Sequence, residues 1–204
     1  MKKILLCLSV LWAGAVSAQP MLVGTIPNAS LNFIQGNNLV FFTSGDSLMV
    51  TDGTAGGTVL VKNGFTSPTP VTTIGDLLYF VSGSGQLWRS DGTEPGTYLL
   101  STFSSPQIEN IYKSGSVLYF SAVTVAEGRE LYRSDGTTGG TILLKDIYAG
   151  SGNGVEYVDY LQVGGTLYFQ ATDATHGKEL WKTDGTTGGT VLVKDVWPVQ
   201  AVVI

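Results

Sequence analysis

The sequence predicts an all-β protein made of tandem four-stranded antiparallel units that form a small or partial β-propeller. Three observations support this prediction. A strand-rich segment recurs four times, an Asp-Gly turn lies at the same place in each copy, and Gly, Thr, Ser, Val, Leu and Tyr are abundant. These residue types are typical of strands joined by tight turns, whereas helices and disordered tails have other compositions.

The first 18 residues are predicted to be a cleavable signal peptide. Residues 1–3 form a basic start, residues 4–15 an apolar run, and Val16-Ser17-Ala18 a small-residue cleavage site. The run is too short to cross a membrane as a helix, and a buried core helix is the alternative interpretation. Cleavage makes Gln19 the new N-terminus. We therefore expect a secreted or surface-displayed protein with no membrane span after processing.

The remaining composition excludes several classes of function. Cys7 is the only cysteine and lies within the predicted signal peptide, so the mature chain has no thiol for disulfides, zinc sites or nucleophilic catalysis. Without Lys2 and Lys3, 9 basic and 16 acidic side chains remain, a formal net charge of −7. Nucleic-acid binding depends on clustered Lys and Arg, so we expect no nucleic-acid partner.

Four internal repeats define the organisation of the chain. The motif segments begin at Ser47, Gln86, Glu130 and Glu179, and their aspartates are 39, 44 and 49 residues apart. A second shared element precedes each motif, as in SVLYF from Ser116 and TLYF from Thr166, and a weaker apolar stretch lies upstream of it. Each unit therefore reads as four short strands, a to d. The predicted segments are an N-terminal strand in 19–27, repeats in 28–64, 65–103, 104–147 and 148–196, and an irregular tail in 197–204.

An Asp-Gly pair lies in the predicted connection between strands c and d of every unit. Glycine adopts the positive φ that a tight turn requires, and the aspartate carboxylate accepts backbone N–H bonds within the turn. We expect eight residues to have this structural role: Asp52, Gly53, Asp91, Gly92, Asp135, Gly136, Asp184 and Gly185.

Two further features concern the strands around this turn. Strand d is a continuous apolar run, as in Ile142-Leu143-Leu144, which predicts that both of its faces are covered. The loop between strands b and c is predicted to be longer in the last two units, over 121–129 and 170–178. Repeats of about 40–45 residues with four strands each are typical of propeller blades, and a β-solenoid is the alternative fold.

The string Glu179-Leu180-Trp181-Lys182-Thr183-Asp184-Gly185-Thr186 resembles the ELWxxDGT repeat family. Residues 130–137 match with Tyr132 in the Trp position, and the first unit departs furthest, with Ser47 and Met49. The resemblance implies a bacterial exported protein without an established enzymatic activity. The apolar tail after Val196 predicts that the chain is a truncated or frame-shifted form of a longer array.

Few residues suggest chemistry. His176, the one histidine, is predicted to be a solvated loop residue without an orienting partner, which argues against a His-dependent triad. One histidine and no cysteine in the mature chain argue against a zinc site. Calcium at the Asp-Gly-Thr turns is a disfavoured alternative to turn stabilisation, because each turn supplies one carboxylate. We therefore expect no cofactor.

The aromatic residues at one repeat position, Trp88, Tyr132 and Trp181, are candidates for a ligand surface, although packing between neighbouring sheets is the favoured role. A sialidase-like propeller glycosidase is the enzymatic alternative. It needs several arginines on one carboxylate, and only Arg89, Arg129 and Arg133 exist. We predict a non-catalytic binding or surface-interaction scaffold, with a carbohydrate or a surface protein as partner.

Overall fold

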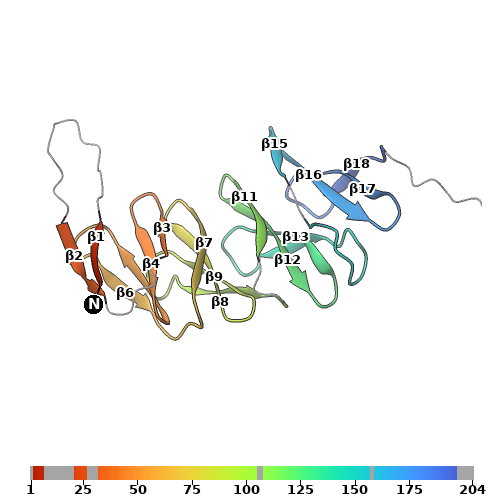
Figure 1. The fold of residues 1–204 in the computed structure, drawn as a ribbon. Helices are drawn as coiled ribbons and strands as arrows, with labels where there is room; N and C mark the ends of the chain where they lie inside the picture. Colours follow the sequence, from red (N-terminus) through yellow and green to blue (C-terminus); the bar gives the residue numbers. More distant parts are fainter. Residues whose placement is uncertain (1, 7–20, 27–31, 105–107, 157–158, 197–204) are drawn as a thin grey trace, which may run out of the picture. The chain divides into compact units, whose positions relative to one another are not determined.

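The fold consists of four separate antiparallel sheets in chain order (Figure 1). The computed structural model describes residues 2–6, 21–26, 32–104, 108–156 and 159–196, and these residues form strands and turns without a helix. Each of the four sheets has four strands, and consecutive strands are hydrogen-bonded neighbours. The predicted all-β fold of tandem four-stranded antiparallel units, of the kind found in propeller blades, is therefore confirmed.

Sheets 1 and 2 come from the first half of the chain. Sheet 1 consists of β3 (Phe33–Gln35), β4 (Val40–Ser44), β5 (Ser47–Thr51) and β6 (Val59–Lys62). Sheet 2 consists of β7 (Thr69–Ile74), β8 (Leu77–Ser82), β9 (Gln86–Ser90) and β10 (Tyr98–Thr102).

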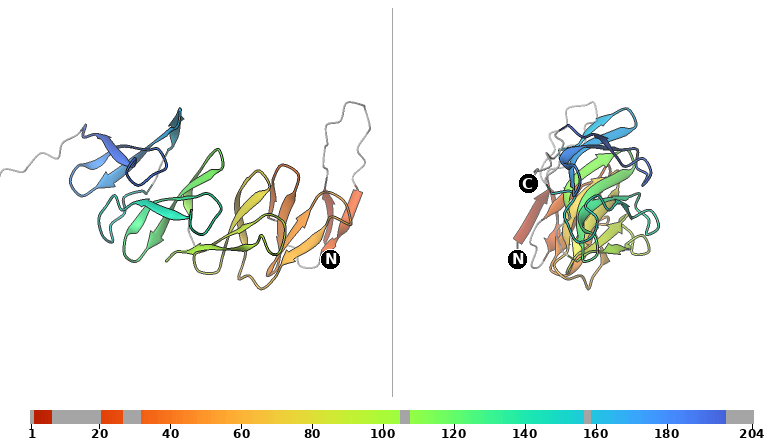
Figure 2. Two further views of the ribbon diagram at one scale, coloured as in Figure 1. Left: turned by 180° about the vertical axis from the view of Figure 1, so that it is seen from behind. Right: turned by 90° about the vertical axis from the view of Figure 1, so that its right-hand side faces the viewer.

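Sheets 3 and 4 come from the second half, and Figure 2 shows their strands from two further directions. Sheet 3 consists of β11 (Glu109–Ser114), β12 (Val117–Thr124), β13 (Gly128–Ser134) and β14 (Ile142–Lys145). Sheet 4 consists of β15 (Leu161–Val163), β16 (Thr166–Asp173), β17 (Gly177–Thr183) and β18 (Val191–Lys194).

A two-stranded sheet lies at the N-terminal end of the chain. It pairs β1 (Lys2–Leu6) antiparallel with β2 (Met21–Ile26). β2 lies in the segment expected to hold an N-terminal strand, and β1 lies within the predicted signal peptide. The predicted cleavage site and the tail over 197–204 lie outside the described residues.

The chain folds as two compact units. Among the described residues, one unit extends to Gly83 and also includes Leu87–Leu99, and the other comprises Ser84–Gln86 and the residues from Leu100 onward. Among these residues no helix is long and apolar enough to cross a membrane.

Every sheet has two distinct faces because strand side chains alternate. We call one the Leu face, since it carries the motif leucine, as at Leu48, Leu131 and Leu180. We call the other the aromatic face, since it carries the residue after that leucine, as at Trp88, Tyr132 and Trp181. Phe169 is opposite Trp181 in the β16–β17 pair, so both lie on the aromatic face of sheet 4.

The core of the first unit joins the Leu face of sheet 1 to the aromatic face of sheet 2. Leu48 and Val61 from sheet 1 are buried in one cluster with Phe80 from sheet 2 and with Phe65 from the connection between the sheets. The Phe65 ring makes edge-on contacts with Phe80 and Trp88, at centroid distances of 5.0 and 5.2 Å. These contacts are the favoured arrangement of aromatic pairs.

The core of the second unit repeats this arrangement. The Leu face of sheet 3, with Leu131 and Leu144, is buried in one cluster with Phe169 and Trp181 from the aromatic face of sheet 4. Ile147, from the connection between these sheets, lies in the same cluster. The same packing rule therefore operates in both units: the Leu face of one sheet packs against the aromatic face of the next.

Two predictions about the strands are wrong. Strand d is not covered on both faces, since Val59, Leu60 and Ile142 are exposed whereas Val61 and Leu144 are buried. The reason is that β6 and β14 are edge strands of their sheets.

The loop between strands b and c is also not longer in the last two units. β12 and β13 pair without interruption as far as Thr124 and Gly128, which leaves a turn of residues 125–127. In sheet 4 the ladder likewise continues to Asp173 and Gly177. The extra residues lengthen the two strands instead of the loop, because each added pair continues the backbone hydrogen bonding.

Candidate functional site

The four Asp-Gly-Thr turns have one common hydrogen-bond network, shown here for the third. Asp135 Oδ1 accepts the backbone N–H of Thr137 at 2.9 Å and its hydroxyl at 2.7 Å. Thr137 Oγ1 in turn accepts the N–H of Gly140 at 2.9 Å. The hydrogen bond from the Thr137 hydroxyl is the main cause of the lowered pKa of Asp135. The carboxylate thus stabilises its own turn and stays ionised.

Two further hydroxyl residues complete the network, and the sequence reasoning did not identify the first of them. Ser134, before the aspartate, accepts the N–H of Gly136 at 3.1 Å. Its Oγ also lies 2.8 Å from Oγ1 of Thr141, which donates to the carbonyl of Thr137. The signal was present in the sequence, since every unit reads Ser/Thr-Asp-Gly-Thr-x-x-Gly-Thr, as in Thr51 to Thr58.

The eight predicted turn residues lie in these networks. The glycine after each aspartate has a positive φ, from 85° at Gly136 to 91° at Gly53. The connection is longer than a two-residue hairpin turn, since residues 135–141 separate β13 from β14. The aspartates at the other turns make the same bonds to the threonine two residues on: Asp52, Asp91 and Asp184.

The candidate ligand-surface aromatics lie in the cores. Tyr132 and Trp181 are buried, and Trp88 is half-buried against Phe65 and Phe80. The Tyr132 ring stacks on Phe120 at a centroid distance of 5.8 Å. These contacts are those of packing residues on the aromatic faces.

The three arginines bind different partners. Arg89 donates to the carbonyl of Gly96 at 3.3 Å, Arg133 donates to that of Gly185 at 2.9 Å, and Arg129 pairs with Glu109 at 2.8 Å.

His176 has a partner, contrary to expectation. Its Nδ1 lies 2.8 Å from Oδ2 of Asp173, and its backbone N–H also donates to this carboxylate. The pKa of His176 is raised, first through this hydrogen bond and also by the charge of Asp173. The partner was missed because His176 was placed in a flexible loop, whereas Asp173 ends β16 and Gly177 begins β17. Both side chains therefore meet at the end of one hairpin.

Glu130, the first residue of the third motif, is fully buried in sheet 3. Its Oε1 accepts the N–H groups of Tyr148 and Gly154 at 2.9 and 3.0 Å. Burial raises its pKa to about 7 although these bonds oppose the shift, and the neighbouring Asp146 charge adds to it. The sequence reasoning missed this site because the motif glutamate resembles an exposed strand residue. In the described part of the chain, no three His, Asp or Glu side chains are grouped to hold a metal ion.

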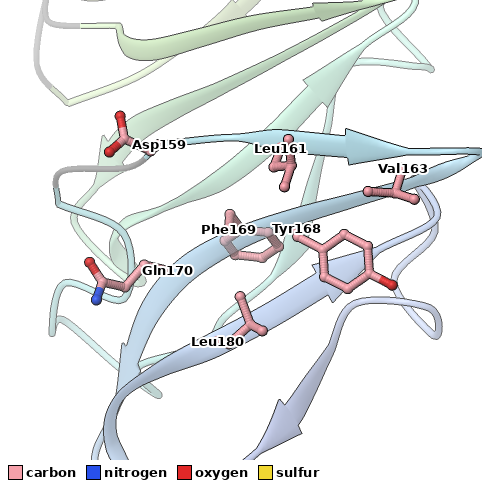
Figure 3. Close-up of a pocket in the computed structure, with 7 residues that line it drawn as sticks. All are labelled: Asp159, Leu161, Val163, Tyr168, Phe169, Gln170 and Leu180. Carbon is pink, nitrogen blue, oxygen red and sulfur yellow. The ribbon is translucent and has the colours of Figure 1, made fainter.

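An open groove lies on the Leu face of sheet 4 (Figure 3). Its volume is about 480 Å³, and Leu161, Val163, Tyr168 and Leu180 form most of its apolar lining. Asp159, Phe169 and Gln170 complete it. Leu161 and Val163 come from β15, Tyr168 from β16 and Leu180 from β17. This composition suits an apolar or aromatic partner, and it includes neither a nucleophile–base pair nor a cluster of carboxylates.

No family model and no curated protein matches the chain. Among solved structures, the computationally designed Ika4 protein is 14% identical, with a TM-score of 0.47, and the match covers 80% of this chain and 98% of that one. BamB from Moraxella catarrhalis is 14% identical, with a TM-score of 0.44 and coverage of 78% and 47%. The N-terminal domain of Nup159 is 12% identical, with a TM-score of 0.42 and coverage of 81% and 47%. The chain thus matches less than half the length of BamB and of the Nup159 domain.

Proposed function

We propose that this protein is an exported, non-catalytic repeat scaffold that acts by binding a partner through the groove on sheet 4. The observation that carries the proposal is the open apolar face around Leu161, Val163 and Leu180, all of which are exposed. A contiguous exposed apolar patch is typical of an interaction site. Export rests on the predicted signal peptide, and the proposed partners are a carbohydrate or a surface protein, with no cofactor.

The polar groups outside the groove support a non-catalytic role. The turn aspartates accept hydrogen bonds from their own turns, as Asp184 does from Thr186 at 2.9 and 2.6 Å. The arginines also bind scaffold groups: Arg129 pairs with Glu109 of β11 in the same sheet, and Arg133 donates to the carbonyl of Gly185. These groups maintain the scaffold, so they are not placed as a set around one substrate.

A glycosidase is the second candidate, because Glu130 has the raised pKa that a general acid requires. Against this candidate, Glu130 has no exposed surface. A sugar ring in the groove on sheet 4 would meet Asp159 as the one carboxylate of the lining, whereas glycosidases normally use two.

The test compares binding with turnover, using full-length protein exported from a bacterial host. We expect capture of a glycan on an array, or of a surface protein in a pull-down, and weaker capture by Leu180→Asp. We expect no hydrolysis of fluorogenic glycosides. Hydrolysis that is lost in Glu130→Gln or Asp159→Asn would overturn the proposal in favour of the enzyme.

A further inference from the structure

The motif leucine has a different environment in the last sheet. Leu48 and Leu131 are fully buried, whereas 45% of Leu180 is exposed. The three residues have the same place in their motifs and lie on the same face of their sheets. The difference therefore comes from what covers that face and not from the strand itself.

Other positions on this face follow the same rule. On strand d, Val61 and Leu144 are buried but Val193 is exposed. In the segment after strand d, Ile147 is 5% exposed, whereas Val196 is 56% exposed. The Leu faces of sheets 1 and 3 are therefore buried, whereas the Leu face of sheet 4 is open.

The two covered faces show what kind of surface fits. The Leu face of sheet 1 is covered by Phe80 and Trp88 from the aromatic face of sheet 2. The Leu face of sheet 3 is covered by Phe169 and Trp181 from the aromatic face of sheet 4. The groove on sheet 4 is therefore suited to another aromatic face of this repeat.

One aromatic face of the chain has exposed apolar groups for this role. On sheet 1, Phe33 is paired with Phe42 and Leu60 with Met49, so all four lie on its aromatic face. Phe33 and Leu60 are exposed, whereas Phe42 is buried and contacts the Phe33 ring. The corresponding faces of sheets 2 and 4 are within the cores already described, and on sheet 3 Leu143, which has the place of Leu60, is half-buried.

We propose that the groove on sheet 4 binds the aromatic face of sheet 1 from a second copy of this chain. The contact is head-to-tail, so two different surfaces meet, and it repeats the packing of sheet 1 on sheet 2 and of sheet 3 on sheet 4. Such a contact gives a closed ring or an open chain of subunits. The inference rests on the proposed binding function and names the partner of the same groove.

The first test is the molar mass of the exported protein over a range of concentrations, by size exclusion with light scattering. We expect the wild type to reach at least twice the monomer mass as concentration rises. Leu180→Asp and Leu60→Asp should each remain monomeric. Val125→Asp is the matched control, because Val125 is 84% exposed in the β12–β13 turn and lies on neither surface. This variant should associate like the wild type.

The second test mixes the two monomeric variants. Each keeps one intact surface, so an equimolar mixture of Leu180→Asp and Leu60→Asp should form a heterodimer and nothing larger. A circular-dichroism melt shows that both variants are folded, since both replaced side chains are exposed. A folded wild type that stays monomeric, or a mixture that does not associate, would overturn the inference.

The binding function and the inference fail in different assays. A monomeric wild type that captures a glycan through Leu180 would overturn the second-copy partner and leave the binding function intact. Glycoside turnover would overturn the binding function, whatever the molar mass.

Discussion

Two adjacent glycines in the third turn have very different surroundings. A Cβ on Gly140 would lie 2.0 Å from Oδ1 of Asp135, whereas a Cβ on Gly139 would meet nothing within 4 Å. The same close approach recurs at Gly57, Gly96 and Gly189. The constant spacing between the aspartate and this glycine in all four repeats thus has a steric cause. The aspartate carboxylate lies so close to the glycine backbone that no side chain fits between them.

We expect Gly140→Ala to lower the free energy of unfolding by about 1–3 kcal/mol, because the methyl group displaces the Asp135 carboxylate from its bonds. Gly139→Ala is the matched control, and we expect it to change stability by less than about 0.5 kcal/mol. Urea denaturation of both variants measures the difference. Equal effects would show that the turn accommodates the methyl group.

A second residue-scale prediction concerns the buried Glu130. Its pKa is raised to about 7 in the folded protein, so the folded state holds a proton that the unfolded state has released. Stability therefore falls as pH rises from about 4.5 to about 7, by up to about 1.4 kcal/mol per pH unit.

The variant Glu130→Gln should flatten this dependence, since the amide oxygen can still accept the N–H groups of Tyr148 and Gly154. The second repeat already carries Gln86 at this position. Denaturation at pH 5 and at pH 8 gives the comparison. If the variant and the wild type lose the same stability over this range, another group is responsible.

At the scale of elements, a phenylalanine shortly after strand d packs on two rings of the following sheet. Phe65 has this role between sheets 1 and 2, and Phe103 makes the same pair of edge-on contacts with Phe120 and Tyr132 of sheet 3. In each case one buried ring from a connection packs on two rings of the following sheet.

We expect Phe65→Ala to destabilise the protein by about 3–5 kcal/mol, because it leaves a cavity between two sheets. Phe33→Ala removes a ring of the same size that is already exposed, so its cost should be smaller. Chemical denaturation monitored by circular dichroism measures both losses. Similar losses in the two variants would contradict the joining role of Phe65.

The periodicity of the sequence predicts most of these strands, and its limits explain the predictions that are wrong. Strands b and c were identifiable because the turn glycines separate them from their neighbours. The one-sided burial of strand d was not, because an apolar run such as Val59-Leu60-Val61 does not reveal that β6 is an edge strand. The network around Ser134 and the burial of Glu130 also required the structure, since both depend on how a turn or loop folds back onto a strand.

At the scale of the whole molecule, each unit buries the Leu face of its first sheet under its second sheet, and the Leu face of sheet 4 is open. The groove on sheet 4 could not be predicted from sequence, because Leu180 occupies the same motif position as the buried Leu131. Its exposure follows from what covers the face and not from the residue.

The beginning of the chain carries a prediction at this scale. β1 lies within the predicted signal peptide, so processing after Ala18 would remove the strand that pairs with β2. Intact-mass spectrometry of the exported protein should show Gln19 as the first residue. Ala18→Tyr, which replaces the small residue at the cleavage site, should keep the longer chain. A wild-type product that retains Met1 would contradict the prediction.

The turn network also has a consequence for chemical ageing. Asp-Gly is a dipeptide prone to isomerisation, in which the glycine nitrogen attacks the aspartate side-chain carbonyl carbon with loss of water, and hydrolysis of the resulting succinimide gives isoaspartate. In each turn the glycine N–H is bound to the preceding hydroxyl, as Gly53 is to Thr51 at 3.0 Å, and the following threonine holds the carboxylate. Neither group is free to react. The folded protein can therefore carry four such dipeptides for long periods without isomerisation.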